Sequence, residues 1–329
     1  MTFIMRTIKS KRVLITGGAG FIGSNIAQAL HEENEVLVLD DLTTGTRNNL
    51  DGLDVELITG SIRDADKVRG AMEGVDYVFH HAAIASVPRS VDDPVSSNQV
   101  NVCGTLRVLM EARDAKVRKV VFASSSAVYG DAPSEIKRED DLPAPISPYA
   151  VTKMTGEMYC RNFWLNYRLP TCSLRYFNVY GPRQDPASDY AAVIPRFISA
   201  AKAGKPLTVF GDGEQTRDFV YVKDVVQANI LAATDEEHHG EVFNVANQEK
   251  VTVNQLASLV LRSLGRKEEG GIVHLDERKG DVKHSLADIG KARRMLGYAP
   301  RFGLEEGLSL TVASMDQSPV RGRSSFPIL

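Results

Sequence analysis

Residues 13–23 read VLITGGAGFIG, and this stretch decides the fold. An apolar run breaks directly into Gly17, Gly18, Gly20 and Gly23, and an amphipathic pattern follows. Glycines at this spacing let a chain leave a strand, turn tightly and enter a helix while its backbone approaches a pyrophosphate. The helix N-terminus then offers free N–H donors and a positive potential. The stretch therefore predicts a dinucleotide-binding turn.

Apolar runs alternate with amphipathic stretches through the first half of the chain. The runs are 12–16, 35–39, 54–58, 75–79, 119–124 and 171–176, and the helical patterns are 21–33, 64–73, 96–115 and 148–167. Strands that alternate with helices favour a parallel sheet covered on both faces. We therefore expect the α/β class, with a doubly wound parallel sheet of the Rossmann type.

The pattern changes after residue 180. Shorter strand candidates at 207–210, 241–245 and 272–275 mix with short helical patterns at 191–204, 223–234 and 253–264. We expect a cofactor-binding Rossmann domain at 1–180 and a smaller mixed α/β substrate-binding lobe at 181–316, parts of which rejoin the main sheet. A flexible tail is expected at 317–329, where proline and glycine recur.

Composition excludes several classes of protein. The chain has 329 residues, a net charge of −3 and no basic stripe, so nucleic acid is not an expected partner. Its apolar runs are too short for a membrane span, and its first residues lack the features of a signal peptide, so we expect a cytoplasmic protein. Cys103, Cys160 and Cys172 are too scattered for a zinc or redox motif, and no metal site is expected.

An acidic pair, Asp40-Asp41, ends the second apolar run. A carboxylate at this place in a dinucleotide fold accepts hydrogen bonds from the adenosine ribose and repels a 2′-phosphate. The nearest arginine is Arg47, which lies further along the chain. The sequence therefore favours NAD over NADP.

A second motif, Tyr149-Ala150-Val151-Thr152-Lys153, lies on a predicted helix. Residues four apart share a helix face, so the lysine charge can stabilise a tyrosine phenolate whose ordinary pKa is about 10. Tyr149 can then take a proton from an alcohol as hydride leaves the same carbon. Ser125, at the end of a strand candidate, can hydrogen-bond the same oxygen. This spacing is common by chance, but after a complete dinucleotide fingerprint it predicts a catalytic set of Ser125, Tyr149 and Lys153.

From about residue 12 to residue 312, the chain resembles the extended short-chain dehydrogenase/reductases, and within them the NAD-dependent nucleotide-sugar epimerases. The motifs that carry this resemblance, besides the glycine turn and the Tyr149–Lys153 pair, are DDLTTG at 40–45, HAA at 81–83, NVCGT at 101–105, SSSAVYG at 124–130, RYFNVYG at 175–181 and RDFVYV at 217–222.

The resemblance implies a set of NAD contacts. The cofactor-binding residues would be Gly17, Gly20, Phe21, Ile22, Gly23, Asp40, Asp41, Leu42, Thr43, Gly45, Ser61, Ile62, Ala82, Ala83, Ala85, Asn101, Ser124, Tyr149, Lys153 and Tyr176. One position departs from the family pattern, because Ser61 stands where an aspartate usually lies near the adenine. A serine hydroxyl can still pair with the adenine amino group, so we expect a weaker contact there.

The resemblance also implies a set of residues that bind a UDP-sugar. The substrate-binding residues would be Ser86, Ser125, Ser126, Tyr149, Asn178, Ala192, Val193, Thr208, Phe210, Arg217, Arg278, Asp281 and Ser285. Two arginines in this set suit a diphosphate, which favours the fork of a guanidinium group. The alternative for each arginine is that it forms an ordinary solvent-exposed ion pair at the surface.

The serine-rich strand end distinguishes the reactions that this family performs. Related 4,6-dehydratases carry an acidic pair after the catalytic hydroxyl, whereas this chain has Ser126 and Ala127. Dehydration is therefore disfavoured, and C4 epimerisation through a transient 4-keto sugar with tightly bound NAD is expected. The family's non-acetylated-hexose members often have a tyrosine where Ser285 aligns, so this small residue favours UDP-N-acetylglucosamine, with UDP-glucose and UDP-galactose also accepted. Ser285 is otherwise an ordinary loop residue.

Three further interpretations follow from the resemblance. The chain is alternatively a UDP-hexuronate 4-epimerase or decarboxylase, or a non-catalytic NAD-binding regulatory protein on the same fold. The intact catalytic set argues against the last.

In this family the helices 96–115 and 148–167 pair across a two-fold axis, so a homodimer through a four-helix bundle is expected. Val95, Val102, Leu106 and Leu109 form an apolar stripe there, which core burial explains equally well.

Overall fold

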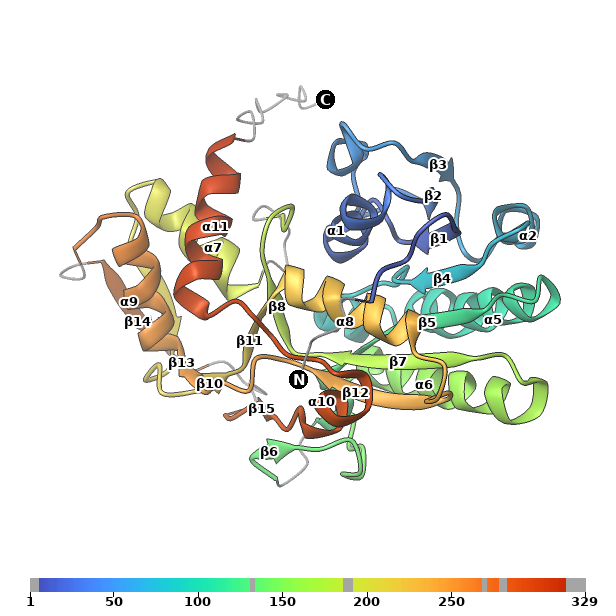
Figure 1. Ribbon diagram of the computed structural model, residues 1–329. Helices are drawn as coiled ribbons and strands as arrows, with labels where there is room; N and C mark the ends of the chain where they lie inside the picture. Colours follow the sequence, from blue (N-terminus) through green and yellow to red (C-terminus); the bar gives the residue numbers. More distant parts are fainter. Residues whose placement is uncertain (1–5, 131–133, 186–191, 268–270, 278–282, 318–329) are drawn as a thin grey trace, which may run out of the picture.

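A seven-stranded sheet forms the centre of the molecule (Figure 1). The computed structural model describes residues 6–130, 134–185, 192–267, 271–277 and 283–317. The strand order is β12-β7-β5-β4-β1-β2-β3, and every neighbouring pair is parallel. The strands are β1 (Arg12–Thr16), β2 (Glu35–Asp40), β3 (Glu56–Thr59), β4 (Tyr77–His80), β5 (Lys119–Ser125), β7 (Thr171–Tyr176) and β12 (Glu241–Val245). The expected doubly wound parallel sheet is confirmed.

Side chains of the central strands alternate between two buried cores, one on each face of the sheet. In β1, Val13 and Ile15 belong to one core and Leu14 to the other, and all are fully buried. The same alternation in β5 sends Val121 to the first core and Val120 to the second. A strand buried on both faces reads as a continuous apolar run, which is why these strands could be located from the sequence.

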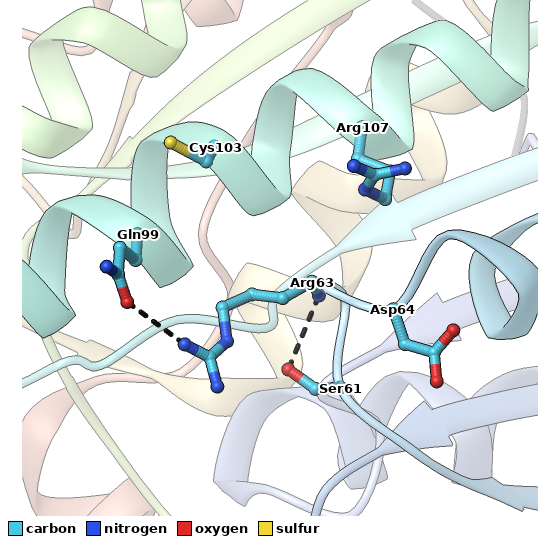
Figure 2. A pocket seen from close by; sticks show the side chains of 6 residues that line it. All are labelled: Ser61, Arg63, Asp64, Gln99, Cys103 and Arg107. Atoms are coloured by element: carbon cyan, nitrogen blue, oxygen red, sulfur yellow. Dashed lines mark hydrogen bonds between the residues drawn. The ribbon is translucent and has the colours of Figure 1, made fainter.

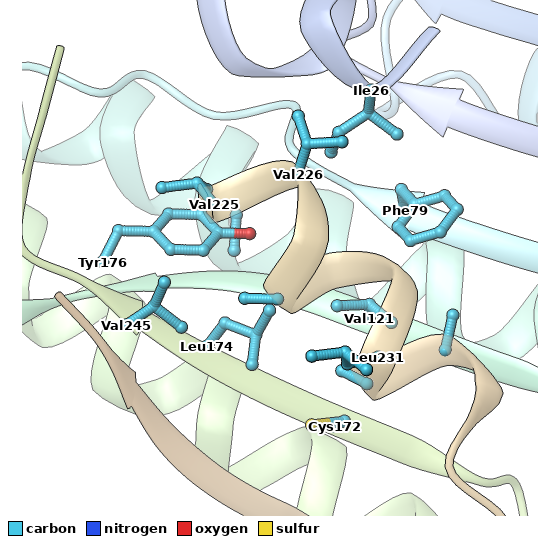
Figure 3. Close-up of a cluster of buried hydrophobic side chains, with 14 of the residues drawn as sticks. Ile26, Phe79, Val121, Cys172, Leu174, Tyr176, Val225, Val226, Leu231 and Val245 are labelled. Atoms are coloured by element: carbon cyan, nitrogen blue, oxygen red, sulfur yellow. The ribbon is translucent and has the colours of Figure 1, made fainter. Parts of the chain in front are cut away.

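Helices cover both faces. The first core lies under α1 (Phe21–Leu30), α8 (Val222–Thr234) and α10 (Gly290–Leu296). Figure 3 shows part of it, with Val225, Val226 and Leu231 of α8 in the same cluster as Val121 and Leu174. The second core lies under α2 (Ala65–Met72), α5 (Thr105–Asp114) and α6 (Pro148–Tyr167).

The single helix expected at 96–115 is divided into three segments. These are α4 (Pro94–Asn98), the π-helical turn η2 (Gln99–Gly104) and α5. A short helix that the sequence analysis did not predict, α3 (Val87–Asp92), precedes them. The wide turn places Asn101 so that its side chain bonds both backbone groups of Ile84, at 2.8 and 3.1 Å. π-Helical turns of this kind are frequent at functional sites.

The second half of the chain builds a smaller lobe with its own core (left side of Figure 1). Its helices are α7 (Val193–Lys202), α9 (Val253–Ser263) and α11 (Leu304–Gln317). Its strand pairs are β9 (Leu207–Phe210) with β14 (Ile272–Leu275), β10 (Thr216–Arg217) with β13 (Val251–Thr252), and β8 (Asn178–Tyr180) with β11 (Phe219–Tyr221). A further pair joins β6 (Ile136–Lys137) and β15 (Leu286–Ala287). Short helical turns are η1 (Arg47–Leu50) and η3 (Ser126–Tyr129).

The chain crosses between the two parts more than once. After the lobe's first elements, β12 returns to the main sheet and pairs with β7. The domain boundaries at 180 and 316 stay a prediction. The expected tail lies outside the described residues except at Gln317, where α11 ends. No helix in the described ranges is long and apolar enough to span a membrane.

The strand order locates the site. The chain runs outward from β1 through β2 to β3 and then returns to β4, on the other side of β1. The connections on either side of this reversal leave the sheet in opposite directions. In open α/β sheets, ligands bind in the resulting crevice at the carboxyl ends of the strands.

Candidate active site

The glycine turn follows β1 and has a shape that only glycine allows. Gly17 has a φ of +71°, and a Cβ atom there would lie 2.6 Å from the Ala82 backbone nitrogen. A Cβ on Gly23 would overlap the Gly17 carbonyl oxygen. No side chain caps the N-terminus of α1 at Gly20, so its first N–H groups are available to an anion. The turn therefore fits the pyrophosphate of a dinucleotide.

Asp40 holds the next loop in place. Its carboxylate accepts hydrogen bonds from the backbone N–H groups of Ala19, at 2.9 Å, and Leu42, at 2.8 Å. Burial raises the pKa of Asp40, while these two N–H donors act in the opposite direction. Each carboxylate oxygen keeps a lone pair for a ribose hydroxyl. Asp41 is exposed and accepts from the Thr43 N–H at 3.0 Å.

The loop that follows Asp41 returns to the glycine turn. A Cβ on Gly45 would lie 2.8 Å from the Ala19 carbonyl carbon. Thr46 donates its backbone N–H to the Ala19 carbonyl at 3.0 Å. The predicted cofactor residues of the two loops, 17–23 and 40–45, are thus brought together as one cradle.

The carboxyl end of β4 forms the other side of this crevice. His80 is fully buried and hydrogen-bonded through both ring nitrogens, to Thr16 at 2.7 Å and to Thr105 at 2.9 Å. Its burial lowers its pKa to about 3, so it is a neutral structural residue. Ala82 donates its N–H to the Thr16 hydroxyl at 3.3 Å. Asn101 fixes the backbone of Ile84, within the predicted contact region of residues 82–85.

The predicted catalytic residues come together at the carboxyl end of β5. Ser147 caps α6 and Pro148 begins it, so Tyr149 and Lys153 lie in its first turns. The Lys153 ammonium donates to the Ala123 carbonyl at 2.7 Å and lies 5.8 Å from the centre of the Tyr149 ring. A hydrogen bond to Ser90 also fixes this helix start, because the Tyr149 N–H donates to the Ser90 hydroxyl at 3.0 Å.

Burial and hydrogen bonding act in opposite directions on the ionisation of Tyr149. Burial raises the pKa of Tyr149 above its ordinary value of 10, and hydrogen bonding with Ser125 opposes this rise. Burial also lowers the pKa of Lys153 to about 8. A protonated Lys153 beside the ring favours the phenolate, so Tyr149 can accept a proton from an alcohol and give it back.

Two predicted cofactor residues, Ser124 and Tyr176, direct their hydroxyls into the protein. Ser124 donates to Glu157, and Tyr176 donates to Asn229 at 3.0 Å. The Tyr176 ring stacks on His81 with centroids 5.9 Å apart, and Figure 3 shows it within the first core. Their hydroxyls therefore support the walls of the crevice.

Several predicted substrate residues lie close together in the smaller lobe. Ser285 donates its N–H to the carbonyl of Thr216 at 3.2 Å, so it neighbours Arg217. The Gln215 side chain donates to the Phe210 carbonyl at 2.8 Å, so the end of β9 lies near the start of β10, two residues before Arg217. Thr208 lies on that strand, while Ala192 and Val193 begin α7.

The remaining predicted substrate residues lie elsewhere. Asn178 begins β8 and donates to the Asp218 carbonyl at 3.1 Å. Ser86 caps α3, and Ser126 begins η3 directly after β5. Arg278 and Asp281 lie outside the described residues.

Ser61 lines a cavity of about 400 Å³ (Figure 2). Its hydroxyl accepts from the Arg63 N–H at 3.3 Å, and the Arg63 guanidinium donates to Gln99 at 3.1 Å. Cys103 and Arg107, on the same helical stretch as Gln99, complete one wall. These neighbours of Ser61 were not among the predicted site residues. Their spacing of four residues, 99, 103 and 107, is the signal that could have grouped them.

No three His, Cys, Asp or Glu side chains in the described part of the chain are arranged to hold a metal ion. The cradle instead fits a dinucleotide, since its glycines leave the space and its helix start leaves the N–H donors that a pyrophosphate needs.

Comparison with known families agrees with this site. Residues 13–246 match the model of the NAD dependent epimerase/dehydratase family, and the chain belongs to that family. NAD is accordingly its cofactor.

Individual relatives cover nearly the whole chain. A UDP-N-acetylglucosamine 4-epimerase from Methanobrevibacter ruminantium M1, solved with UDP-N-acetylmuramic acid, is 42% identical with a TM-score of 0.90, over 94% of this chain and 99% of that one. A UDP-glucose 4-epimerase from Thermus thermophilus, in complex with NAD, is 37% identical with a TM-score of 0.83, over 94% and 100%. A UDP-N-acetyl-alpha-D-glucosaminuronate decarboxylase from Bacillus cytotoxicus is 35% identical, over 92% and 97%.

Proposed function

We propose that this protein is a UDP-N-acetylglucosamine 4-epimerase, which interconverts UDP-N-acetylglucosamine and UDP-N-acetylgalactosamine and also accepts UDP-glucose and UDP-galactose. The observation that carries the proposal is the group of Ser125, Tyr149 and Lys153 at the carboxyl end of β5, beside a cradle that fits NAD. NAD, when bound, accepts a hydride from the sugar carbon and returns it.

In this mechanism Tyr149 removes the proton of the sugar 4-hydroxyl and later returns a proton to the 4-keto oxygen. Ser125 hydrogen-bonds the same oxygen, and the charge of Lys153 stabilises the phenolate. The 4-keto sugar must rotate between the two steps so that its other face receives the hydride. Rotation requires a loose hold on the hexose and a firm hold on the UDP, and Arg217 suits a diphosphate.

The residue that favours an N-acetyl sugar is Ser285. It lies next to Arg217 in the structure, and its short side chain leaves room for an acetamido group. The similarity to a UDP-N-acetylglucosamine 4-epimerase at 42% identity supports the same substrate.

Incubation of the purified protein with each UDP-sugar, followed by chromatographic resolution of the products, tests the proposal. We expect 4-epimers from UDP-N-acetylglucosamine and UDP-glucose. A Ser285→Tyr variant should lose the N-acetyl substrate while keeping UDP-glucose. The absence of a 4-epimer from every UDP-sugar would refute the assignment.

A second candidate is a UDP-hexuronate 4-epimerase or decarboxylase, which the similarity to the Bacillus cytotoxicus decarboxylase favours. Turnover of UDP-glucuronate without turnover of neutral UDP-sugars would establish it. A non-catalytic NAD-binding role would require that none of these sugars reacts.

We also propose that the protein is a homodimer through α5 and α6. On α6, Val151, Met158 and Leu165 recur every seven residues and are 45%, 59% and 54% exposed. On the neighbouring helical stretch, Val95 and Met110 are 64% and 43% exposed. Apolar side chains that share one helix face and stay exposed mark a helix-packing surface.

Light scattering coupled to size exclusion tests this surface. We expect twice the chain mass for the native protein and a single chain mass for Met158→Glu. Leu142→Glu is the matched control, because Leu142 is 87% exposed in the loop between β6 and α6 and lies on neither helix. A native monomer would refute the dimer.

A further inference from the structure

A buried ion pair lies directly behind the catalytic group. Glu157 follows Tyr149 and Lys153 on α6 at intervals of four residues, so the three side chains share one helix face. Arg175 of β7 donates to both carboxylate oxygens of Glu157, from Nε at 2.9 Å and from Nη2 at 2.8 Å. The two side chains are 4% and 6% exposed.

The Glu157 carboxylate is connected to the end of β5, where the catalytic serine lies. The hydroxyl of Ser124, which precedes Ser125, donates to Glu157. The residue before that, Ala123, accepts from Lys153. Consecutive residues of β5 are therefore tied to consecutive turns of α6. A shift of Glu157 would move the strand end on which Ser125 depends.

Glu157 also supplies the negative charge near Lys153. Burial lowers the pKa of Lys153, whereas negative charge at Cys160 and at Glu157 raises it. The other titratable groups close by are Cys160, whose pKa burial raises to about 12, and His80 and His81, whose pKa values burial lowers to about 3. All three are neutral near pH 7. With the Cys160 thiol protonated and Tyr149 not ionised, Glu157 is the described neighbour whose charge favours the Lys153 proton.

Arg175 is held by a second set of contacts. Its guanidinium lies 4.6 Å from the centre of the Tyr129 ring, and the Tyr129 hydroxyl donates to Asn244 at 2.7 Å. A buried ion pair gains little net stability over apolar residues of the same size, because both charges lose their hydration. Stability alone does not explain why this pair is present.

We propose that Glu157 is a positioning residue for catalysis: held in a fixed geometry by Arg175, it keeps Lys153 charged and the end of β5 in register with Tyr149. This inference rests on the proposed function, because it assigns a role within the same proton transfer. It adds to the catalytic set a residue that does not touch the substrate.

The consequence is a specific change in pH dependence. In Glu157→Gln the carboxylate charge is lost, so Lys153 releases its proton at lower pH. The alkaline limb of the kcat profile should then move down by about one pH unit or more, as expected for loss of a neighbouring opposite charge. On that limb, a shift of one unit lowers kcat about tenfold.

The experiment measures kcat against pH for the NAD-loaded enzyme and its variants. Glu157→Asp keeps the charge and should restore the native alkaline limb, even where its kcat is lower. The matched control is Lys119→Met at the opposite end of β5, since Lys119 and Asp235 form another buried pair, each 2% exposed. This control should be less stable and keep the native pH profile.

A substrate-free measurement separates this inference from the proposed function. The Lys153 ammonium is titrated by NMR in ¹³Cε-lysine-labelled, NAD-loaded protein, with Lys153→Met to assign its signal. A lower pKa in Glu157→Gln supports the inference even where the enzyme turns over no UDP-sugar. The same pKa in both proteins overturns it, whatever the activity.

A double variant provides a second test in case Glu157→Gln folds poorly. Glu157→Gln with Arg175→Met removes both charges of the ion pair, so neither partner stays buried without the other and the variant should fold better. Its Lys153 should still titrate below the native value, because Glu157 is the group that favours the Lys153 proton. A native titration in the double variant would also overturn the proposal.

Discussion

Replacement of Gly17 by alanine tests the geometry of the cofactor turn. Gly17 has a φ of +71°, which is unfavourable for alanine by about 1–2 kcal/mol. The new Cβ would also lie 2.6 Å from the Ala82 nitrogen and 2.8 Å from the Ala82 Cα. These are backbone atoms of the segment that follows β4, so they cannot turn aside as a side chain would. Overpacking of this kind adds about 1–3 kcal/mol.

Gly17→Ala should therefore lower the free energy of unfolding by about 2–5 kcal/mol, the sum of the strain and the overlap. It should also weaken NAD binding, because the turn must open. Gly204→Ala is the control, since Gly204 has a φ of +72° and nothing within 4 Å of its added Cβ. It should lose only about 1–2 kcal/mol. Urea unfolding and calorimetric titration with NAD measure both effects. Equal losses in the two variants would refute the close approach.

Further predictions concern the supporting structure. Lys119→Met removes the buried cation beside Asp235, whose carboxylate keeps Arg6 at 3.6 Å and the backbone N–H of His238. The free energy of unfolding, measured in urea, should fall by about 3 kcal/mol, the lower end of the cost of breaking a buried pair. The pKa of His80 falls from 6.5 to about 3 on folding, so its contribution to stability is complete above pH 6.5 and declines in acid. The decline should reach about 2 kcal/mol at pH 5. His80→Asn should flatten this decline when unfolding curves are measured over a series of pH values. Asn101→Ala removes both hydrogen bonds to Ile84, so it should speed backbone hydrogen exchange in residues 82–86 and weaken NAD binding. Unchanged exchange rates would show that Asn101 does not hold this segment.

The central strands could be located from the sequence because each is buried on both faces. The expected 12–16 and 171–176 are the observed bounds of β1 and β7. β1 carries apolar residues toward both cores, whereas β7 turns apolar residues toward the first core and buries Thr171, Ser173 and Arg175 on its other face. The catalytic residues could be grouped because Tyr149 and Lys153 are one helical turn apart and Ser125 ends a strand. Local periodicity locates the strands and the Tyr149–Lys153 pair, and the glycine turn earlier in the chain marks that pair as catalytic.

Contacts between distant segments could not be predicted in this way. β6 and β15 have two residues each, and their pairing joins 136 to 286 across the chain. The wide turn at Gln99–Gly104 depends on Asn101 meeting Ile84, which no helical period reveals. By contrast, α3 had a readable start, with Ser86 as its cap and Pro88 in its first turn.

The ion pair behind the site combines both cases. The spacing of Tyr149, Lys153 and Glu157 by four residues placed the carboxylate on the catalytic face, and this signal was available in the sequence. Its partner Arg175 lies on a strand whose place beside α6 is set by the tertiary fold. The position of the Glu157 carboxylate could be predicted from the sequence, whereas its pairing with Arg175 required the structure.

The most direct test is the epimerase turnover of Tyr149→Phe with NAD bound. We expect kcat to fall by about 10²–10⁴-fold, the range that general acid–base catalysis contributes, while the protein still retains NAD. Tyr159→Phe, on the same helix α6, should keep native turnover. A Tyr149→Phe protein that converts UDP-sugars at the native rate would contradict the assignment of Tyr149 as the base.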